Sequence, residues 1–428
     1  MAEERGGWKR PFLTVWTGQQ FSLVGSQLVQ FALVWWLTQK TGSATVLATA
    51  TMVAILPQVL IGPLAGALID RWSRRRVMIV ADGAIALVST WLAYLFFAGS
   101  VEVWHIFVVA AARAVGGGFH FPAMAASTTL MVPREHLARV AGLNQATRGA
   151  TGIVAPPLGA LLLSFLPMYG ILGIDVLTAA VAIVPLLFIP IPQPEPISSS
   201  TSGRPSVLRE MREGFRYVLA WPGLLLVLVM AMLINFVANP AGALLPLFVT
   251  KHLHGDALSL GWLNSSLGVG VVLGGLALGV WGGFRRRIVT TLLGVVGMGL
   301  GFLVVGLAPE GGLWIAAGGL FFAGTMNAMA NGPLSALLQS QVAPGMQGRV
   351  FTLVQSLVTA MSPLSLALAG PLADLFGIRF LYVVSAAVMV LMGAGTLLVR
   401  PILHLEDDRA PEPTPAGEVA PDSARPVD

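Results

Sequence analysis

Long apolar runs that recur along the whole chain are the feature that most constrains its fold. Many of them exceed about 18 residues, the length that lets an α-helix cross a hydrocarbon core of about 30 Å. The runs are continuous rather than alternating, so they predict helices and not the strands of a barrel. Only 11% of the residues are charged, against about 25% in soluble domains. The sequence therefore predicts an all-α membrane protein with many spans.

Twelve spans can be placed, six on each side of a polar segment. The first span is longer than the apolar region of a secretory signal, so we expect it to be retained. The predicted spans are 11–37, 44–69, 77–99, 103–131, 140–165, 168–191, 222–249, 257–283, 288–307, 311–340, 348–373 and 378–400. We predict these domains: a six-helix bundle at 1–191, a linker at 192–221, a second six-helix bundle at 222–403 and a tail at 404–428.

The linker and the tail differ in composition from the spans. Residues 192–206 are rich in Pro and Ser, whereas residues 207–219 place apolar side chains at helical spacing among Arg209, Arg212 and Arg216. This pattern predicts an amphipathic helix on the inner leaflet of the membrane. The tail is rich in Pro, Ala and acidic residues, which predicts disorder.

The distribution of basic residues predicts the orientation in the membrane. With the N-terminus inside the cell, 21 of the 25 Lys and Arg residues lie in cytoplasmic segments, and only Lys40, Lys251 and Arg379 lie outside. Arg113 falls inside a span. Basic residues concentrate on the cytoplasmic side of membrane proteins, so both termini and the linker are predicted to be cytoplasmic in a cell-membrane protein. The pI of about 10.1 therefore reflects topology, and no nucleic-acid partner is expected.

The two halves repeat a set of landmarks about 211 residues apart. Duplicated halves around a central site are typical of secondary transporters. The counterpart of Arg113 in this repeat is Gly324, so the duplication does not require the arginine. The matching landmarks are Arg74–Arg76 with Arg285–Arg287, Pro122 with Pro333, Pro133 with Pro344, and Arg139-Val140 with Arg349-Val350.

Charges are concentrated in the stretch GPLAGALIDRWSRRRVMIVADG at residues 62–83. Its arginines hold the turn in the cytoplasm, whereas Asp70 contributes nothing to topology. We hypothesise that Asp70 contacts basic groups or the positive N-terminus of another helix and so holds the two halves together. Two glycines four residues apart allow a neighbouring helix to approach closely. The residues of this predicted gating loop are Gly62, Gly66, Asp70, Arg71, Arg74 and Arg75.

This loop, between the second and third spans of a chain organised as six plus six, resembles the signature of the major facilitator superfamily. Ser73 stands where that signature has its second glycine. The stretch Arg113–Gly117 resembles the family's buried-arginine motif. Gly152, Pro156, Pro157 and Gly159 partly match its antiporter motif. Residues 16–48, 132–162 and 208–224 resemble the macrolide-efflux branch of the drug:proton antiporters.

The resemblance implies a fold of two six-helix bundles and a transport function rather than an enzymatic one. It implies secondary active efflux of amphipathic small molecules, drug or macrolide-like, by alternating access. The proton gradient is then the driving force and no cofactor is needed. The expected partners are the bilayer, the substrate and protons, with the protein working as a monomer.

Ionisable residues inside spans are functional candidates, because a buried charge is costly unless it is paired or hydrated. Arg113 lies well inside the fourth span, Asp82 inside the third and Asp175 inside the sixth. A carboxyl group away from water binds a proton more readily, so either acid can serve as a coupling site. We take Asp82 as the first candidate for the acid near Arg113. His120 can lie at the depth of Asp82 and pair with it.

Amide side chains inside spans are the candidates for a substrate cavity. Amides are costly against lipid, so they are expected to face either a cavity or a neighbouring helix through hydrogen bonds. Both alternatives stay open from sequence. The candidates are Gln20, Gln27, Asn235, Asn239, Asn327 and Asn331.

Several function classes are disfavoured. The chain has no cysteine, and no phosphate-binding GxxxxGK[ST] or metal-ligand spacing of His, Asp and Glu, so ATP-driven transport and metal sites are not expected. An importer or facilitator of a small metabolite, or a siderophore exporter, is an alternative on the same fold. A receptor or scaffold that transports nothing is a third reading, which the buried Arg113 and the amides disfavour.

Overall fold

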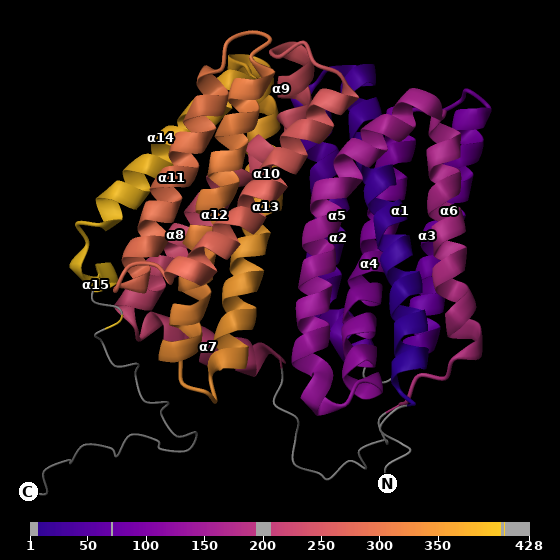
Figure 1. The fold of residues 1–428 in the computed structure, drawn as a ribbon, viewed down its shortest axis with the longest axis horizontal. Coiled ribbons are helices and arrows are strands. Elements are labelled where there is room, and N and C mark those ends of the chain that lie inside the picture. The colour runs from indigo at the N-terminus through magenta and orange to yellow at the C-terminus, as the bar shows by residue number, and fades with distance from the viewer. Residues whose placement is uncertain (1–6, 70–71, 194–206, 404–405, 407–428) are drawn as a thin grey trace, which may run out of the picture.

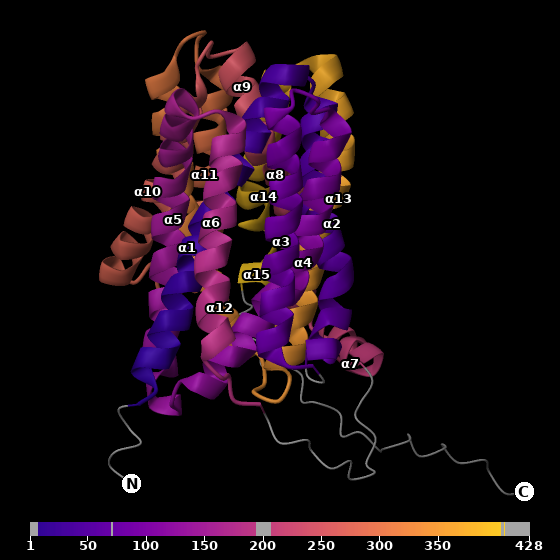
Figure 2. The same ribbon diagram turned by 90° about the vertical axis from the view of Figure 1, so that its right-hand side faces the viewer.

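The computed structural model describes residues 7–69, 72–193, 207–403 and 406, without the side chains of 63, 64, 66, 67 and 207–211. Within this part of the chain, twelve helices are long and apolar enough to cross a membrane. The predicted all-α architecture is therefore confirmed. In Figures 1 and 2 the long helices run roughly parallel to one another, with α7 at one end of the molecule and α9 at the other.

The first half of the chain folds into six long helices that pack on one another, chiefly α1 on α6, α2 on α4, and α3 on α4 and α6. A one-turn 3₁₀ helix at Arg134–His136 precedes α5. Gly42 ends α1 with a φ of 56°, a left-handed conformation that suits glycine. The helices are α1 (Lys9–Thr41), α2 (Ala44–Ile69), α3 (Arg74–Phe97), α4 (Val103–Met131), α5 (Leu137–Phe165) and α6 (Met168–Phe188).

The second half forms its own group, in which α12 packs on α10 and α11, α14 on α11, and α13 on α8. The linker helix α7 (Val207–Leu219) precedes it and contacts α13. Figure 1 shows the two groups standing side by side. The helices are α8 (Pro222–Ala243), α9 (Leu245–Lys251), α10 (Ala257–Trp281), α11 (Arg287–Leu307), α12 (Leu313–Gln341), α13 (Gln347–Phe376), α14 (Ile378–Thr396) and α15 (Arg400–Leu403).

The seventh span differs from its prediction as one helix over 222–249. It breaks at Leu244 into α8 and α9. Pro246 lies in the first turn of α9 and has no N–H to donate to Gly242, so a continuous helix would lack a hydrogen bond at this place. The break places the short α9 across the end of the molecule, where it contacts α1.

Two helix pairs make most of the contact between the halves, α2 with α13 and α5 with α10. Both rely on glycine for a close approach. A Cβ atom built on Gly370 of α13 would lie 2.8 Å from the Thr45 Cα atom of α2, and one built on Gly261 of α10 would lie 2.8 Å from the Pro157 Cα atom of α5. Helices in membranes associate through such small residues because their backbones can then pack directly.

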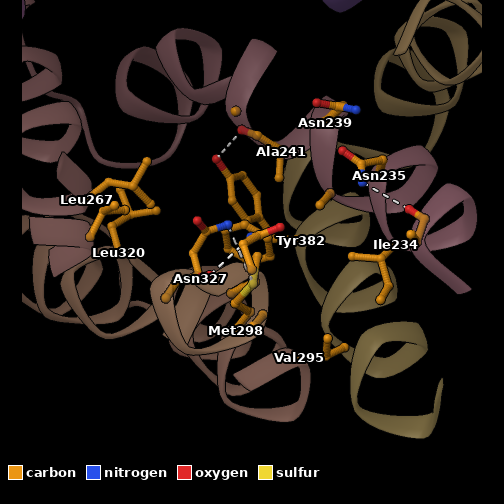
Figure 3. Close-up of a pocket in the computed structure, with 18 of the residues that line it drawn as sticks. Ile234, Asn235, Asn239, Ala241, Leu267, Val295, Met298, Leu320, Asn327 and Tyr382 are labelled. Atoms are coloured by element: carbon orange, nitrogen blue, oxygen red, sulfur yellow. Dashed lines mark hydrogen bonds between the residues drawn. The ribbon is translucent and has the colours of Figure 1, made fainter. Parts of the chain in front are cut away.

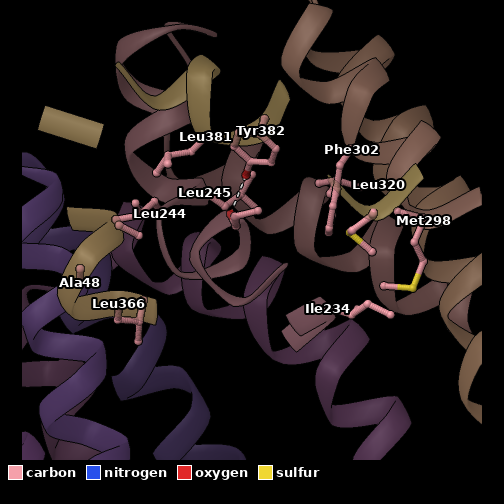
Figure 4. Packing of buried hydrophobic residues seen from close by; sticks show 14 of the residues in the cluster. Ala48, Ile234, Leu244, Leu245, Met298, Phe302, Leu320, Leu366, Leu381 and Tyr382 are labelled. Carbon is pink, nitrogen blue, oxygen red and sulfur yellow. Dashed lines mark hydrogen bonds between the residues drawn. The ribbon is translucent and has the colours of Figure 1, made fainter. Parts of the chain in front are cut away.

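The buried apolar residues form a core that extends across the interface between the halves. It includes Ala48 of α2 and Leu366 of α13, which Figure 4 shows together with the interior of the second half. Outward-facing side chains are apolar as well: Val280 is 92% exposed and Phe97 70% exposed. A protein surrounded by lipid needs an apolar exterior as well as an apolar core. With twelve long apolar helices in the described part of the chain, the protein is therefore a multi-pass membrane protein.

Candidate functional site

A buried ion pair lies at the centre of the first half. Arg113 of α4 donates from Nη1 to Asp175 Oδ2 of α6 at 2.5 Å, and the Asp175 side chain is only 1% exposed. Ser89 of α3 accepts from Arg113 at 2.7 Å and donates to the same carboxylate oxygen at 2.8 Å. Ser26 of α1 donates to the other oxygen at 3.1 Å. Four helices thus supply the hydrogen bonds that a buried charge pair needs.

A second polar cluster holds the other buried acid of this half. Gln19 of α1 donates from Nε2 to Asp82 Oδ2 of α3 at 3.1 Å. His120 of α4 lies 2.8 Å from the Gln19 Oε1 atom and 3.3 Å from Asp82 Oδ1. All three side chains are buried. The pairing of His120 with Asp82 predicted from their similar depth is confirmed.

The two clusters form regular layers across the first half. Each of three helices supplies one residue to each layer, and the two residues are separated by seven positions, about two helical turns or 10 Å. The pairs are Gln19 and Ser26 on α1, Asp82 and Ser89 on α3, and His120 and Arg113 on α4. The second layer also contains Asp175, which comes from α6.

This layering corrects the expectation that Asp82 is the acid beside Arg113. Asp82 lies in the other layer with His120, and the partner of Arg113 is Asp175. Asp82 and Ser89 lie on the same face of α3, and Ser89 is the residue of α3 that meets Arg113. Asp82 is therefore separated from Arg113 by depth, about two helical turns, and not by the direction in which α3 faces.

A cavity of about 350 Å³ opens beside both layers, and we call it the charged cavity. Gln27 lines it, as predicted for a cavity amide. Gln20 lines neither of the two cavities described here, and its neighbour Gln19 takes the place expected for it. One position along a helix is a turn of about 100°, enough to exchange the two faces. The polar residues of the charged cavity include Gln19, Gln27, Gln30, Gln58, Asp82, Arg113 and His120.

The second half contains a cavity of about 360 Å³ whose polar lining is mostly amide, and we call it the amide cavity. All four predicted asparagines line it, Asn235 and Asn239 from α8 and Asn327 and Asn331 from α12. Asn264 of α10 joins them, although its single position in a glycine-rich span gave no periodic signal. Figure 3 shows three of these amides around Tyr382.

Apolar side chains complete the amide cavity. Met298 and Phe302 come from α11, Leu320 from α12 and Leu267 from α10. The Tyr382 hydroxyl donates to the Ala241 carbonyl at 2.6 Å, so its ring is fixed as part of the wall. None of the described residues that line this cavity carries a charge at neutral pH.

The antiporter-like motif of α5 lies at the interface with α10. Pro157 has no N–H, so the Ile153 carbonyl loses its helical partner, and Ser265 of α10 donates to that carbonyl at 2.5 Å. Gly261 packs against both Pro156 and Pro157. Of the two other motif residues, Gly159 faces Phe31 of α1, whereas a Cβ atom built on Gly152 would meet nothing within 4 Å.

The predicted gating loop is described only in part. Gly62 and Gly66 lie within α2, whereas Asp70 and Arg71 lie outside the described residues, so the proposed contact of Asp70 stays a prediction. Arg75 donates to the carbonyls of Leu186 and Leu187 at the end of α6. Of the two residues before Arg75, Arg74 is buried, and Ser73 accepts a hydrogen bond from the Arg76 N–H and caps α3.

The linker helix α7 is present and is held against the second half. Glu213 pairs with Arg349 of α13 at 2.8 Å, and Tyr217 and Val218 are buried. Phe215 and Leu219 are exposed on the other side. The apolar residues predicted to share one face thus divide between a protein contact and an exposed surface.

Comparisons with known proteins agree with this architecture. A profile of the Major Facilitator Superfamily matches residues 15–365 and 227–426. Macrolide efflux protein A of Streptococcus pyogenes is 33% identical over 404 residues, which cover 94% of this chain and 99% of that protein. Multidrug efflux pump Tap of Mycolicibacterium fortuitum is 25% identical over 396 residues, covering 89% of this chain and 94% of that pump.

Solved structures show the same fold at low sequence identity. The crystal structure of a POT family transporter in complex with 5-aminolevulinic acid matches with a TM-score of 0.71 at 11% identity, covering 92% of this chain and 96% of that chain. A bacterial homolog of the lysosomal transporter Spinster, in an inward-facing and unoccupied conformation, matches with a TM-score of 0.66 at 14% identity, covering 93% and 96%. With two six-helix bundles and a profile match over most of its length, this chain belongs to the Major Facilitator Superfamily.

Proposed function

We propose that the protein exports amphipathic small molecules of the macrolide type from the cell by proton-coupled alternating access. The observation that carries the proposal is the buried pair of Arg113 and Asp175 beside the charged cavity. Burying charged groups in a membrane interior is costly, so a charge pair at this position indicates a function. The relatives named for macrolide and multidrug efflux support the choice of substrate and of direction.

The geometry suggests how a proton is coupled to movement. While Asp175 is ionised, Arg113 and two serines satisfy it, and α1, α3, α4 and α6 are held together. A proton on Asp175 removes the charge that Arg113 requires, so the pair loses most of its attraction. The helices that meet there can then rearrange. Binding and release of one proton thus favour two different packings of the first half.

The halves contact each other toward the end where α9 lies, through Asp374 of α13 and the start of α2. The distribution of basic residues predicts this end to be extracellular. We therefore infer that the structure represents the state closed to the outside, in a cell-membrane protein whose termini are cytoplasmic. The proton gradient is the proposed driving force, without a bound cofactor, and one chain is the proposed working unit.

The decisive experiment measures accumulation of radiolabelled erythromycin in cells with and without the protein, and again after a protonophore collapses the gradient. We expect lower accumulation only with the protein and an intact gradient. An importer would raise accumulation, a facilitator would be insensitive to the protonophore, and a scaffold would have no effect.

Asp175→Asn tests the coupling step. The amide keeps the shape but cannot exchange a proton, so gradient-driven efflux should be lost while exchange of labelled for unlabelled substrate in liposomes persists. Asp256→Asn is the matched control, because Asp256 caps α10 at its exposed start and asparagine caps equally well. Full gradient-driven efflux by Asp175→Asn would exclude Asp175 as the proton carrier.

A further inference from the structure

The two halves of the protein share one architecture, but the side chains that line their cavities differ in charge. Arg113, Asp82 and His120 line the charged cavity, whereas none of the described residues that line the amide cavity is charged. The repeat counterpart of Arg113 is Gly324, and a Cβ atom built there would lie 2.2 Å from the Leu267 carbonyl oxygen. Close packing of α12 on α10 therefore excludes even a small side chain at the position that carries the charge in the first half.

We propose that the amide cavity is a substrate subsite that binds an uncharged, oxygen-rich and otherwise apolar group, such as the face of a macrocyclic lactone. This inference rests on the proposed function and specifies which part of the substrate the second half recognises. Proton exchange then belongs to the charged cavity, and substrate recognition through neutral groups belongs to the amide cavity.

Two polar groups of this cavity are buried without a partner in the described structure. They are the Nδ2 atom of Asn239 on α8 and the hydroxyl of Thr291 on α11. Thr291 is only 1% exposed. Most buried polar groups are hydrogen-bonded, because leaving one unpaired costs about 1–3 kcal/mol. Both residues line the cavity, and each of these donors lacks the acceptor that an oxygen-rich ligand would supply.

The other amides are held in place and keep hydrogen-bonding capacity in reserve. Asn235, Asn264 and Asn331 each donate one N–H to the carbonyl four residues earlier on their own helices, at 2.9, 3.0 and 3.0 Å. A side-chain amide has two N–H donors and one carbonyl acceptor, so each keeps a second donor and its oxygen. Fixed neutral donors favour ester, ketone, ether and hydroxyl oxygens, and offer no counter-charge to a cation.

The apolar walls define the rest of the ligand. Met298, Phe302 and Leu320 line the cavity together with the amides. Figure 3 shows Met298 and the fixed ring of Tyr382 close to Asn327. Methionine adapts to varied shapes, which suits a pump for related compounds. A volume of about 360 Å³ is at the small end for ligand pockets, about 300–1,000 Å³, and therefore fits one face of a large amphiphile.

The test compares binding of erythromycin, whose amino sugar is cationic, with binding of its neutral aglycone, erythronolide B, to the purified full-length protein. We expect both compounds to bind. Asn239→Leu and Thr291→Val should weaken binding of both compounds by about two- to tenfold each, the effect of one neutral hydrogen bond. Gln39→Leu and Thr14→Val likewise replace an amide and a hydroxyl by aliphatic groups, at exposed positions of α1, and serve as controls.

Thermal unfolding separates a ligand contact from a structural contact. Each of the two cavity variants removes an unpaired buried polar group, so the melting temperature without ligand should stay the same or rise. A structural role would instead lower the melting temperature together with the affinity. Loss of affinity without loss of stability is therefore the result that supports the subsite.

The contrary outcomes are distinct. If erythromycin binds and the aglycone does not, recognition depends on the cation and the inference is wrong, while the proposed function stands. The inference is also wrong, and the proposed function again stands, if both compounds bind the two variants with unchanged affinity. Loss of stability together with affinity in the variants has the same meaning. If neither compound binds the unaltered protein, both the subsite and the proposed function for macrolides are wrong.

Discussion

Arg113 and Asp175 constrain each other at the residue scale, because removing one leaves the other charged in a low-dielectric interior. Arg113→Ala should lower the thermal stability, since breaking a buried pair costs about 3–5 kcal/mol. Adding Asp175→Asn should restore much of that stability but no gradient-driven efflux. Arg113→Lys keeps the charge and loses only the planar geometry, so it should retain part of the activity. Thermal unfolding and efflux of these three variants and of Asp175→Asn alone decide the question. Additive losses of stability in the double variant would contradict the pairing.

The residues of this network could be predicted from the sequence, but their pairing could not. Charges inside spans are rare enough to single out Arg113, Asp82 and Asp175 without a structure. Ser26 and Ser89 carry no such signal, because hydroxyl groups are common in spans and bond to their own helix. The pairing of Arg113 with Asp175 depends on the depth of each residue and on the rotation of α4 and α6. The predicted spans give depth only to within a few residues and do not give the rotation.

At the scale of elements, one carboxylate of α13 caps the first turn of α2 in the other half. Asp374 accepts from the backbone N–H groups of Ala44 and Thr45 at 2.8 and 2.9 Å, and from the hydroxyl groups of Ser43 and Thr45 at 3.1 and 2.7 Å. A carboxylate at a helix N-terminus is stabilising. This cap forms only while the halves are closed at this end. It was not predictable, because its partners lie some 330 residues apart in the chain.

Asp374→Ala should therefore favour the state open at this end. A cap contributes about 0.5–2 kcal/mol, which corresponds to a shift of about two- to thirtyfold in the ratio of the states. Spin labels at Lys40→Cys and Phe376→Cys would report the separation of the halves, in a chain that has no native cysteine.

Asp256→Ala removes a cap that lies within one half and should leave those distances unchanged. Hydrogen bonds from the Ser259 backbone N–H and hydroxyl hold the pKa of Asp256 below its usual value. The control therefore also removes an ionised carboxylate at neutral pH. Equal distance distributions in Asp374→Ala and in the unaltered protein would show that the cap does not stabilise the closed state.

The whole molecule has a predicted orientation that labelling can check. Cysteine at Glu310, between α11 and α12, should react with an impermeant maleimide applied to intact cells. Cysteine at Ala220, after α7, should react only after the cells are opened. Both positions are exposed in the structure. Labelling of the Ala220 variant in intact cells would show that the predicted orientation is wrong.

At this scale the sequence was most informative. Span number, the division into six plus six and the helix in the linker follow from hydropathy and composition, which average over many residues. The break at Leu244 was not predicted, because Pro246 lies within an otherwise continuous apolar run. The contrast between the two cavities was not predicted, because cavities depend on which helix faces meet.

The uncharged lining of the amide cavity has an electrical consequence. If protons enter through the first half while a neutral molecule leaves through the second, each proton exchanged carries one net positive charge into the cell. The membrane potential then adds about 2.3 kcal/mol per 100 mV to the driving force for each charge. A monovalent cation exported for one proton would move no net charge. Neutral substrates should therefore produce an inward current across a voltage-clamped bilayer, and cationic substrates exchanged one for one should be electrically silent.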